Sequence, residues 1–233
     1  MPCTLPASLA DAAVCRGSFH AVLGGEAGEA VFADFSAALQ KAQAEGRILT
    51  ASLFRYGNHL FFYAEGLNRP FTPQGLCPAL DAALLPWPPA LGEAAPRPWA
   101  AMQPYFYHDV PTTAADWQQG RCPQRRRGRI ALLPPDKWCS YMEHHLRIVT
   151  EGLVEGDRWH LICVQEGVLF SYLEEPRTNV NIRHQLGAHS PELDAWIAAD
   201  PESHFARFTP EQKAHPDSGH NFVFLPRIAG TED

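Results

Sequence analysis

Tyr141 and His145 stand four positions apart, and their side chains are the ones in this sequence best suited to acid–base chemistry on a small molecule. Residues four apart on an α-helix are neighbours on its surface, so the phenol and the imidazole would face the same way. Imidazole takes up and releases protons near neutral pH, as general acid–base catalysis requires. The two residues are therefore a candidate catalytic pair; the alternative is a histidine satisfied within the core or at its edge.

The pair belongs to a segment with the periodicity of an amphipathic helix, over roughly residues 136–152. Asp136 is expected to be its N-cap, and Gly152 is a typical C-terminal stop. The residues of one face recur every three or four positions. They are Trp138, Tyr141, His145, Ile148 and Gly152.

The elements around this helix occur twice in the chain. Residues 60–65 read LFFYAE and residues 169–174 read LFSYLE, and each follows a strand-like run and a short polar turn, which together predict a β-hairpin. Both halves have the order strand, helix, hairpin, variable segment, strand, which is the ferredoxin-like pattern. The matching segments are the strands 18–23 and 129–133, the helices 29–45 and 136–152, and the closing strands 103–110 and 220–227.

This repeat predicts an α+β protein with two tandem ferredoxin-like units, residues 15–110 and 128–227, joined by a linker over 111–127. A lone ferredoxin-like sheet leaves one face bare, and two such units commonly cover it by packing sheet on sheet. We therefore expect an intrachain pseudo-dimer whose sheets face each other as an α/β barrel, and a monomer or a dimer of pseudo-dimers in solution. The proline-rich stretch 70–98 predicts an irregular excursion.

Comparison of the two copies places the chemistry in the second. Superposing the predicted helices pairs Phe32 with Tyr141 and Ser36 with His145, while His144 lies on the flank. Buried polar groups without partners cost about 1–3 kcal/mol, so a fold keeps them on an apolar face only when they are paired or used. The first copy, with its apolar face, is expected to be a degenerate site.

Composition excludes several classes of protein. A net charge of −7 argues against a nucleic-acid partner, and the basic run of Arg125 to Arg127 with Arg129 is interpreted as a solvated linker. No segment approaches the ~20 apolar residues of a membrane span, so we expect no membrane association. The six cysteines show no CxxC spacing, which favours a cytoplasmic location. Histidines 204, 215 and 220 match no metal-binding template, so no metal is expected.

The second copy resembles the L-rhamnose mutarotase family, small ferredoxin-like proteins that dimerise into an α/β barrel. The segment YMEHHLRI, residues 141–148, is similar to the family's first-helix motif, in which a tyrosine precedes the catalytic histidine by four positions. LFSYLE is similar to its second hairpin strand, and HPDSGHNFVFLP, residues 215–226, to its closing loop and strand. Trp196 falls where the family has a tryptophan pair lining the sugar pocket, although the second position is Ile197 here.

The resemblance implies interconversion of the α and β anomers of L-rhamnose or a related sugar, with neither a metal nor an organic cofactor. It implies that His145 exchanges protons with the sugar and that Tyr141 orients the sugar or assists the transfer. It also implies that Asp217 holds sugar hydroxyls and that Trp196 stacks on an apolar sugar face. Two alternatives stay open: a non-catalytic small-ligand or sugar-binding protein, and a haem or oxygenase-type dimeric α/β barrel protein with His144 or His145 as axial ligand.

Overall fold

The computed structural model describes residues 5–152, 154–177, 183–184, 189–213 and 217–231. The described strands form two five-stranded antiparallel sheets and one two-stranded ribbon, accompanied by short and long helices, which confirms the α+β class. The chain divides into two compact units. The first contains Met1–Met102, Pro111–Pro123 and Arg227–Asp233, and the second Gln103–Val110 and Gln124–Pro226. The barrel of facing sheets stays a prediction.

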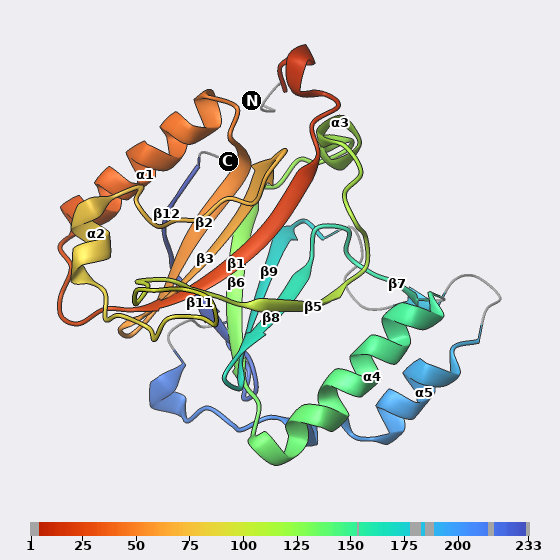
Figure 1. Ribbon diagram of the computed structural model, residues 1–233. Helices are drawn as coiled ribbons and strands as arrows, with labels where there is room; N and C mark the ends of the chain where they lie inside the picture. The colour runs from red at the N-terminus through yellow and green to blue at the C-terminus, as the bar shows by residue number, and fades with distance from the viewer. Residues whose placement is uncertain (1–4, 153, 178–182, 185–188, 214–216, 232–233) are drawn as a thin grey trace. The chain divides into compact units, whose positions relative to one another are not determined.

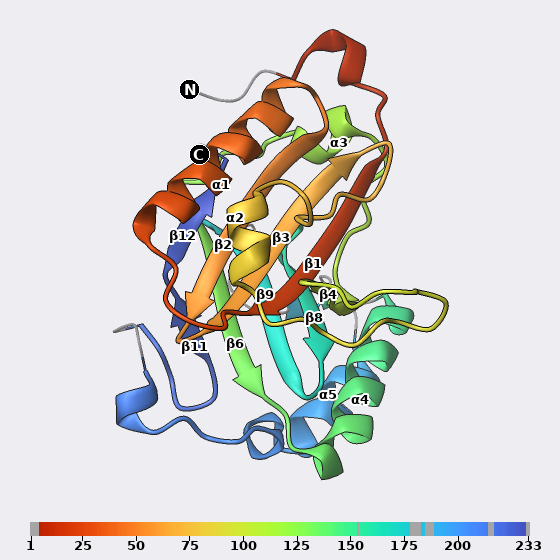
Figure 2. The ribbon, with the colours of Figure 1, turned by 60° about the vertical axis from the view of Figure 1, so that its left-hand side comes forward.

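The first unit has a ferredoxin-like strand order with one strand added. Its elements are η1 Ala7–Leu9, β1 Val14–Val22, α1 Glu29–Ala44, β2 Ile48–Tyr56, β3 His59–Leu67, α2 Pro78–Ala83, β4 Ala100–Ala101, α3 Ala114–Gln118 and β12 Arg227–Gly230. β3 lies between β1 and β2 and is antiparallel to both, β4 pairs with the other side of β1, and β12 is added beside β2. The helices α1 and α2 lie on the same face of this sheet (Figure 1 and Figure 2).

Aromatic rings pack together in the core of the first unit. Phe62 of β3 is fully buried and faces α1, where its ring centroid lies 5.7 Å from that of Phe35. Trp99 packs on both rings, at 6.1 Å from Phe62 and 6.3 Å from Phe35. The hydrophobic positions of α1 recur at intervals of three and four residues, so one continuous helix face is buried here.

The second unit repeats this order. Its elements are β5 Gln103–Tyr107, β6 Arg125–Leu132, η2 Pro135–Lys137, α4 Trp138–Glu151, β7 Val154–Glu155, β8 Leu161–Gln165, β9 Val168–Glu175, β10 Arg183–His184, α5 Pro191–Ala198, η3 Pro201–His204, η4 Pro210–Gln212 and β11 Val223–Leu225. β9 lies between β6 and β8, and β11 pairs with the other side of β6, as β4 does with β1. The added strand is β5, beside β8.

Each half of the chain gives its last strand to the sheet of the other half. After β4 has paired with β1, the chain continues into β5, which pairs with β8; after β11 has paired with β6, it continues into β12, which pairs with β2. The strand expected at 103–110 was assigned to the first unit, whereas β5 lies in the second sheet. An alternating apolar pattern predicts a strand but does not specify its partner, and this exchange is therefore not readable from the pattern.

The basic run is part of the second sheet, and its interpretation as a solvated linker is wrong. Arg125 already begins β6, and it pairs with Glu175 of β9 at 2.7 Å, as Arg127 does at 3.0 Å. The acidic residues that end β9 lie opposite the run in antiparallel register, so the positive charges are compensated within the sheet. Residues 111–123, the rest of the expected linker, belong to the first unit, where Trp117 of α3 is fully buried.

The proline-rich stretch 70–98 is irregular apart from α2 and isolated bridges. Within the described part of the chain, no helix is long and apolar enough to cross a membrane.

The LFxYxE echo in the sequence corresponds to the same buried interaction in both units. The Tyr63 hydroxyl donates to Glu65 at 2.6 Å, and the Tyr172 hydroxyl donates to Glu174 at 2.6 Å. In the first unit, Arg121 completes the cluster with a 2.6 Å ion pair to the fully buried Glu65. Burial acts to raise the pKa of Glu65, but Arg121 outweighs it and holds that pKa below its ordinary value.

We predict that Glu65→Gln destabilises the protein by about 3–5 kcal/mol, because it leaves the buried Arg121 guanidinium without its counter-charge. Urea unfolding followed by circular dichroism measures the difference. Glu45→Gln is the control, because Glu45 pairs with Lys41 and Arg47 at an exposed surface and its removal should cost no more than about 1 kcal/mol. Equal effects of the two substitutions would contradict a stabilising role for the buried pair.

Candidate functional site

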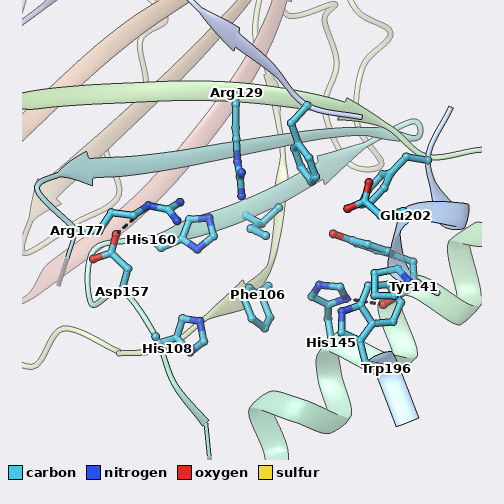
Figure 3. Close-up of a pocket in the computed structure, with 15 residues that line it drawn as sticks. Phe106, His108, Arg129, Tyr141, His145, Asp157, His160, Arg177, Trp196 and Glu202 are labelled. Carbon is cyan, nitrogen blue, oxygen red and sulfur yellow. Dashed lines mark hydrogen bonds and ion pairs between the residues drawn. The ribbon is translucent and has the colours of Figure 1, made fainter. Parts of the chain in front are cut away.

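A cavity of about 260 Å³ lies in the second unit, between α4 and the sheet (Figure 3). Its walls come from several elements, because the ferredoxin-like order places a helix over the middle strands and the exchanged β5 at their edge. The side chains used below are Phe106 and His108 at the end of β5, Arg129 of β6, Tyr141 and His145 of α4, Asp157 and His160 before β8, Ile162 of β8, Arg177 after β9, Trp196 of α5 and Glu202 of η3.

Three of the four residues predicted for the site meet in this cavity. Tyr141, His145 and Trp196 line it together and are all buried. Asp217 does not belong to the lining: it is half-exposed and forms a 2.9 Å ion pair with Arg127. The placement of Asp217 at a sugar-binding position is therefore not supported by the geometry, since a carboxylate held outside the cavity cannot bind hydroxyls within it.

Tyr141 and His145 lie on the buried face of α4, at the usual helical spacing of buried residues. Tyr141, His145 and Ile148 are its buried residues, and Gly152 ends it in the left-handed conformation with φ of 69°. The start differs from expectation: Asp136 lies in the 3₁₀ turn η2, and α4 begins at Trp138. Pro135 is the first residue of this turn, a position that suits proline because the first amide groups of a helical segment have no partner within it.

The observed burial corrects the predicted correspondence between the residues of α1 and those of α4. The buried series Phe35, Leu39, Ala42 of α1 has the spacing of Tyr141, His145, Ile148 in α4. The burial pattern thus pairs Phe35 with Tyr141 and Leu39 with His145, in place of the predicted Phe32 and Ser36. Sequence spacing alone could not fix this phase, since Phe32 is buried as well. The contrast between an apolar and a polar face remains.

His145 is held in one tautomer by its own helix. Its Nδ1 lies 2.9 Å from the backbone oxygen of Tyr141, and because a carbonyl only accepts, Nδ1 carries the hydrogen. The neutral ring then has its lone pair on Nε2. Burial lowers the pKa of His145 to about 4, against the opposing effect of the hydrogen bond to Tyr141 and with a further lowering by His144. At neutral pH the imidazole is therefore an uncharged acceptor.

Tyr141 supplies the complementary donor. Figure 3 shows its hydroxyl directed into the cavity, and its ring lies 4.1 Å from that of His145. Burial raises the pKa of Tyr141 to about 12, although a hydrogen bond with Tyr105 and, after it, the charge of Arg129 act in the opposite direction. The phenol thus keeps its proton at neutral pH. A proton acceptor and a proton donor stand side by side in a largely aromatic pocket, closed further by Trp196 and Phe106, whose rings lie 4.9 and 4.8 Å from that of His145.

Arg129 lines the cavity but was not identified from the sequence as part of the site. It projects from β6 into the cavity (Figure 3), with its guanidinium 4.3 Å from the Phe222 ring. Its Nε is buried and has no hydrogen-bond partner among the described residues. Burial, followed by the charge of Arg177, lowers the pKa of Arg129 to about 10, so it stays charged at neutral pH. Strand alternation was the available signal, since residue 129 shares a face with the apolar residues 131 and 133.

The helix-facing layer of the second unit lacks one large side chain that the first unit has. Register pairs Phe62 with Phe19 in the first unit and Ser171 with Arg129 in the second. In the first unit the Phe62 ring fills the layer beneath the helix, whereas Ser171 leaves that layer open. Replacement of a phenyl ring by a hydroxymethyl group in a packed layer removes the volume that would otherwise exclude a ligand.

Polar groups gather at the end of the cavity away from Tyr141. Asp157 and Arg177 form an ion pair at 4.0 Å, and His108 and His160 lie beside them (Figure 3). No recognisable motif in the sequence contains these four residues, because the segments that carry them have no helical or strand periodicity. Glu202, on the Tyr141 side, is exposed and accepts a hydrogen bond from Asn221.

Among the described residues, no group of histidine, cysteine, aspartate or glutamate side chains has the geometry of a metal site. His204 is buried against Ser140, His220 is exposed, and His215 lies outside the described residues. The haem alternative, with His144 or His145 as axial ligand, stays a prediction. The ring of His144 lies 5.2 Å from that of Trp196.

Comparison with known proteins identifies neither a family nor an activity for this chain. No protein-family model and no curated protein matches the sequence. Solved structures that align include provisionally assigned monooxygenases from Lactobacillus acidophilus (6% identity, TM-score 0.40, 94% of this chain and 96% of that one) and Fusobacterium nucleatum (8%, 0.40, 94% of each chain). Another is an anthrone oxidase-like protein (8%, 0.36, 92% of each chain). Likeness at this level bears neither on the activity nor on the resemblance to the mutarotase family.

We predict that His145→Leu makes the protein less sensitive to acid. The folded state keeps the imidazole neutral down to a pKa of about 4, whereas the unfolded chain protonates near 6.5. Wild-type stability is therefore greatest above about pH 6.5 and is lost as the pH falls toward 4, by roughly 3 kcal/mol from this residue. Leucine, the residue that Leu39 shows to fit such a helix face, removes this contribution.

The measurement is the free energy of unfolding by urea at pH 7 and at pH 4.5, for the wild type and the variant. His220→Leu is the matched control, because His220 is exposed and its loss should leave the pH dependence as it is. The prediction is wrong if the two variants keep the same slope with pH.

Proposed function

We propose that the cavity is the active site of an aldose mutarotase-type isomerase, which interconverts the α and β anomers of a sugar by proton transfer. The observation that carries the proposal is the fixed pair on α4. His145 donates through Nδ1 to the Tyr141 carbonyl and so offers Nε2 as an acceptor, while the Tyr141 phenol beside it remains a donor. Anomer exchange requires one acceptor and one donor acting on neighbouring oxygens of the same ring.

The reaction balances over these two residues. The anomeric hydroxyl gives its proton to Nε2 of His145, the bond between the anomeric carbon and the ring oxygen breaks, and the ring oxygen takes the proton of Tyr141. The open-chain aldehyde rotates about the bond between its first two carbons. On closure, the chain hydroxyl returns its proton to the Tyr141 phenolate as it attacks the other face of the carbonyl. The imidazolium then protonates the new anomeric oxygen, and both residues are restored.

The surroundings of the pair suit this reaction. The hydrogen bond with Tyr105, followed by the charge of Arg129, lowers the pKa of Tyr141 from the value that burial alone would impose, which favours the transient phenolate. The polar end of the cavity, with Asp157, His108 and His160, offers partners for sugar hydroxyls. Trp196 forms an apolar wall on the other side. The mutarotase resemblance of the second copy is consistent with these roles and supplies the reaction class.

We predict that His145→Gln slows catalysed anomer exchange by about 10²–10⁴-fold and that Tyr141→Phe slows it by a similar factor, since each removes one proton-transfer group. Saturation-transfer NMR between the α and β anomers of L-rhamnose and related deoxy sugars measures the rate directly. His144→Gln is the control, because it alters a neighbouring imidazole that flanks the pair, and it should keep the rate within a few-fold of wild type. Failure of the wild type to accelerate exchange in any sugar tested, with sugar still bound, would indicate a binding protein instead.

The rate of catalysed anomer exchange should fall only on the acidic side. Because His145 acts as the neutral base and its pKa is lowered to about 4, catalysed exchange should be flat from pH 8 to pH 5.5 and fall as the pH drops through about 4. The spontaneous rate, measured without protein at each pH, is subtracted. A fall centred near pH 6.5 would show that the reacting base is an ordinary exposed histidine.

A further inference from the structure

Arg129 brings an uncompensated positive charge into the cavity. The neighbouring arginines have carboxylates: Arg127 pairs with Glu175 and Asp217, and Arg177 with Asp157. Across the described ranges, no aspartate or glutamate forms an ion pair with Arg129. Arg129 is partly buried, with its guanidinium over the Phe222 ring at 4.3 Å, so an anion that entered the cavity would supply the missing counter-charge.

The other carboxylates of the cavity do not satisfy that need. Asp157 is buried and engaged with Arg177 at 4.0 Å. Glu202 is exposed, so water solvates its charge, and Figure 3 shows it on the Tyr141 side rather than against Arg129. The charge left over in the buried part of the cavity is positive.

The fold itself does not require a cation at this position. In the first unit the equivalent layer consists of Phe19, Phe62 and Leu53, which lie side by side on β1, β3 and β2. In the second unit the same register positions hold Arg129, Ser171 and Ile162. The Ser171 hydroxyl is also buried without a hydrogen-bond partner among the described residues. Two adjacent strands thus carry polar side chains where the first unit has phenyl rings, and of these two side chains Arg129 lines the cavity.

The ligand group that fits is a carboxylate. A guanidinium is planar and recognises the planar carboxylate through parallel hydrogen bonds, which a neutral hydroxyl cannot provide. The volume of about 260 Å³ admits a single monosaccharide rather than an oligosaccharide. The reacting pair Tyr141 and His145 lies across the cavity from this donor group (Figure 3). In a six-carbon sugar acid, the anomeric carbon and the carboxylate-bearing carbon flank the ring oxygen, which separates the two ends in the same sense.

We propose that the substrate is an aldose that carries a carboxylate, a uronic acid, with its carboxylate bound by Arg129 and its anomeric carbon at Tyr141 and His145. The proposal rests on the mutarotase-type function above and narrows its substrate class from neutral deoxy sugars to acidic sugars.

Matched sugars test the proposal by isothermal titration. D-Galacturonate and D-galactose differ only at the sixth carbon, as do D-glucuronate and D-glucose. Wild-type protein should bind at least one uronate about 10-fold or more tightly than its neutral partner. Arg129→Gln should lose that preference. Arg125→Gln, on the same strand but exposed and paired with Glu175, should keep the preference. Neutral sugars that bind wild type as tightly as the uronates would overturn the proposal.

Thermal unfolding provides a second readout that needs no turnover. Without ligand, Arg129→Met should melt at a higher temperature than wild type, because it removes a buried charge and keeps the apolar stem. The preferred uronate should raise the melting temperature of wild type and leave that of Arg129→Met unchanged. A variant that melts at a lower temperature than wild type would show that Arg129 is a structural cation, which overturns the proposal.

The experiments distinguish failure of the mutarotase function from failure of the acidic-substrate proposal. Arg129-dependent uronate binding without faster anomer exchange would sustain the anion site and overturn the mutarotase function. Accelerated exchange that is equal for neutral sugars and uronates would sustain the function and overturn the acidic substrate.

Discussion

The chemistry of the cavity depends on the register of β9 between β6 and β8. That register sets Ser171 between Arg129 and Ile162, directly beneath the helix face that carries the reacting pair. A slip of one residue would turn each of these side chains to the opposite face of the sheet. The register is stabilised outside the cavity, where Glu174 accepts a hydrogen bond from Tyr172 and faces Arg126. The buried polar contacts at the end of the hairpin therefore position the groups at its middle.

The two units use buried polarity in different ways. In the first, Glu65 accepts hydrogen bonds from Tyr63, Trp117 and Arg121, so its charge is fully compensated and serves stability. The second unit keeps the equivalent contact between Tyr172 and Glu174, and it adds Arg129 in the helix-facing layer, where the arginine Nε has no hydrogen-bond partner among the described residues. A satisfied network rigidifies a fold, whereas an unsatisfied group lowers stability until a ligand completes it. The first unit is thus consistent with a scaffold and the second with a binding site.

Local patterns in the sequence predicted the elements well, and failed where partners are chosen over long distances. The repeat, both hairpins and both long helices follow from periodicity and turn chemistry. The exchange of β5 and β12 depends on which sheet edge is free, which no local window contains. Arg129 was missed for the same reason: it stands in a run of arginines whose acidic partners lie on β9, some 50 residues later. The helix pair Tyr141 and His145 was found because both members lie within one turn.

The energetics of the reacting pair constrain how the protons move. With a pKa of about 12 for Tyr141 and about 4 for His145, complete transfer of a proton from phenol to imidazole lies roughly 11 kcal/mol uphill before their mutual attraction is counted. A turnover of ~10³ s⁻¹ corresponds to a barrier of about 13 kcal/mol, so a fully formed imidazolium and phenolate would leave little for breaking the carbon–oxygen bond. For the proposed anomer exchange, this favours proton transfers that are concerted with cleavage of that bond. Each residue then carries only partial charge at the transition state, which suits a pair buried among aromatic rings.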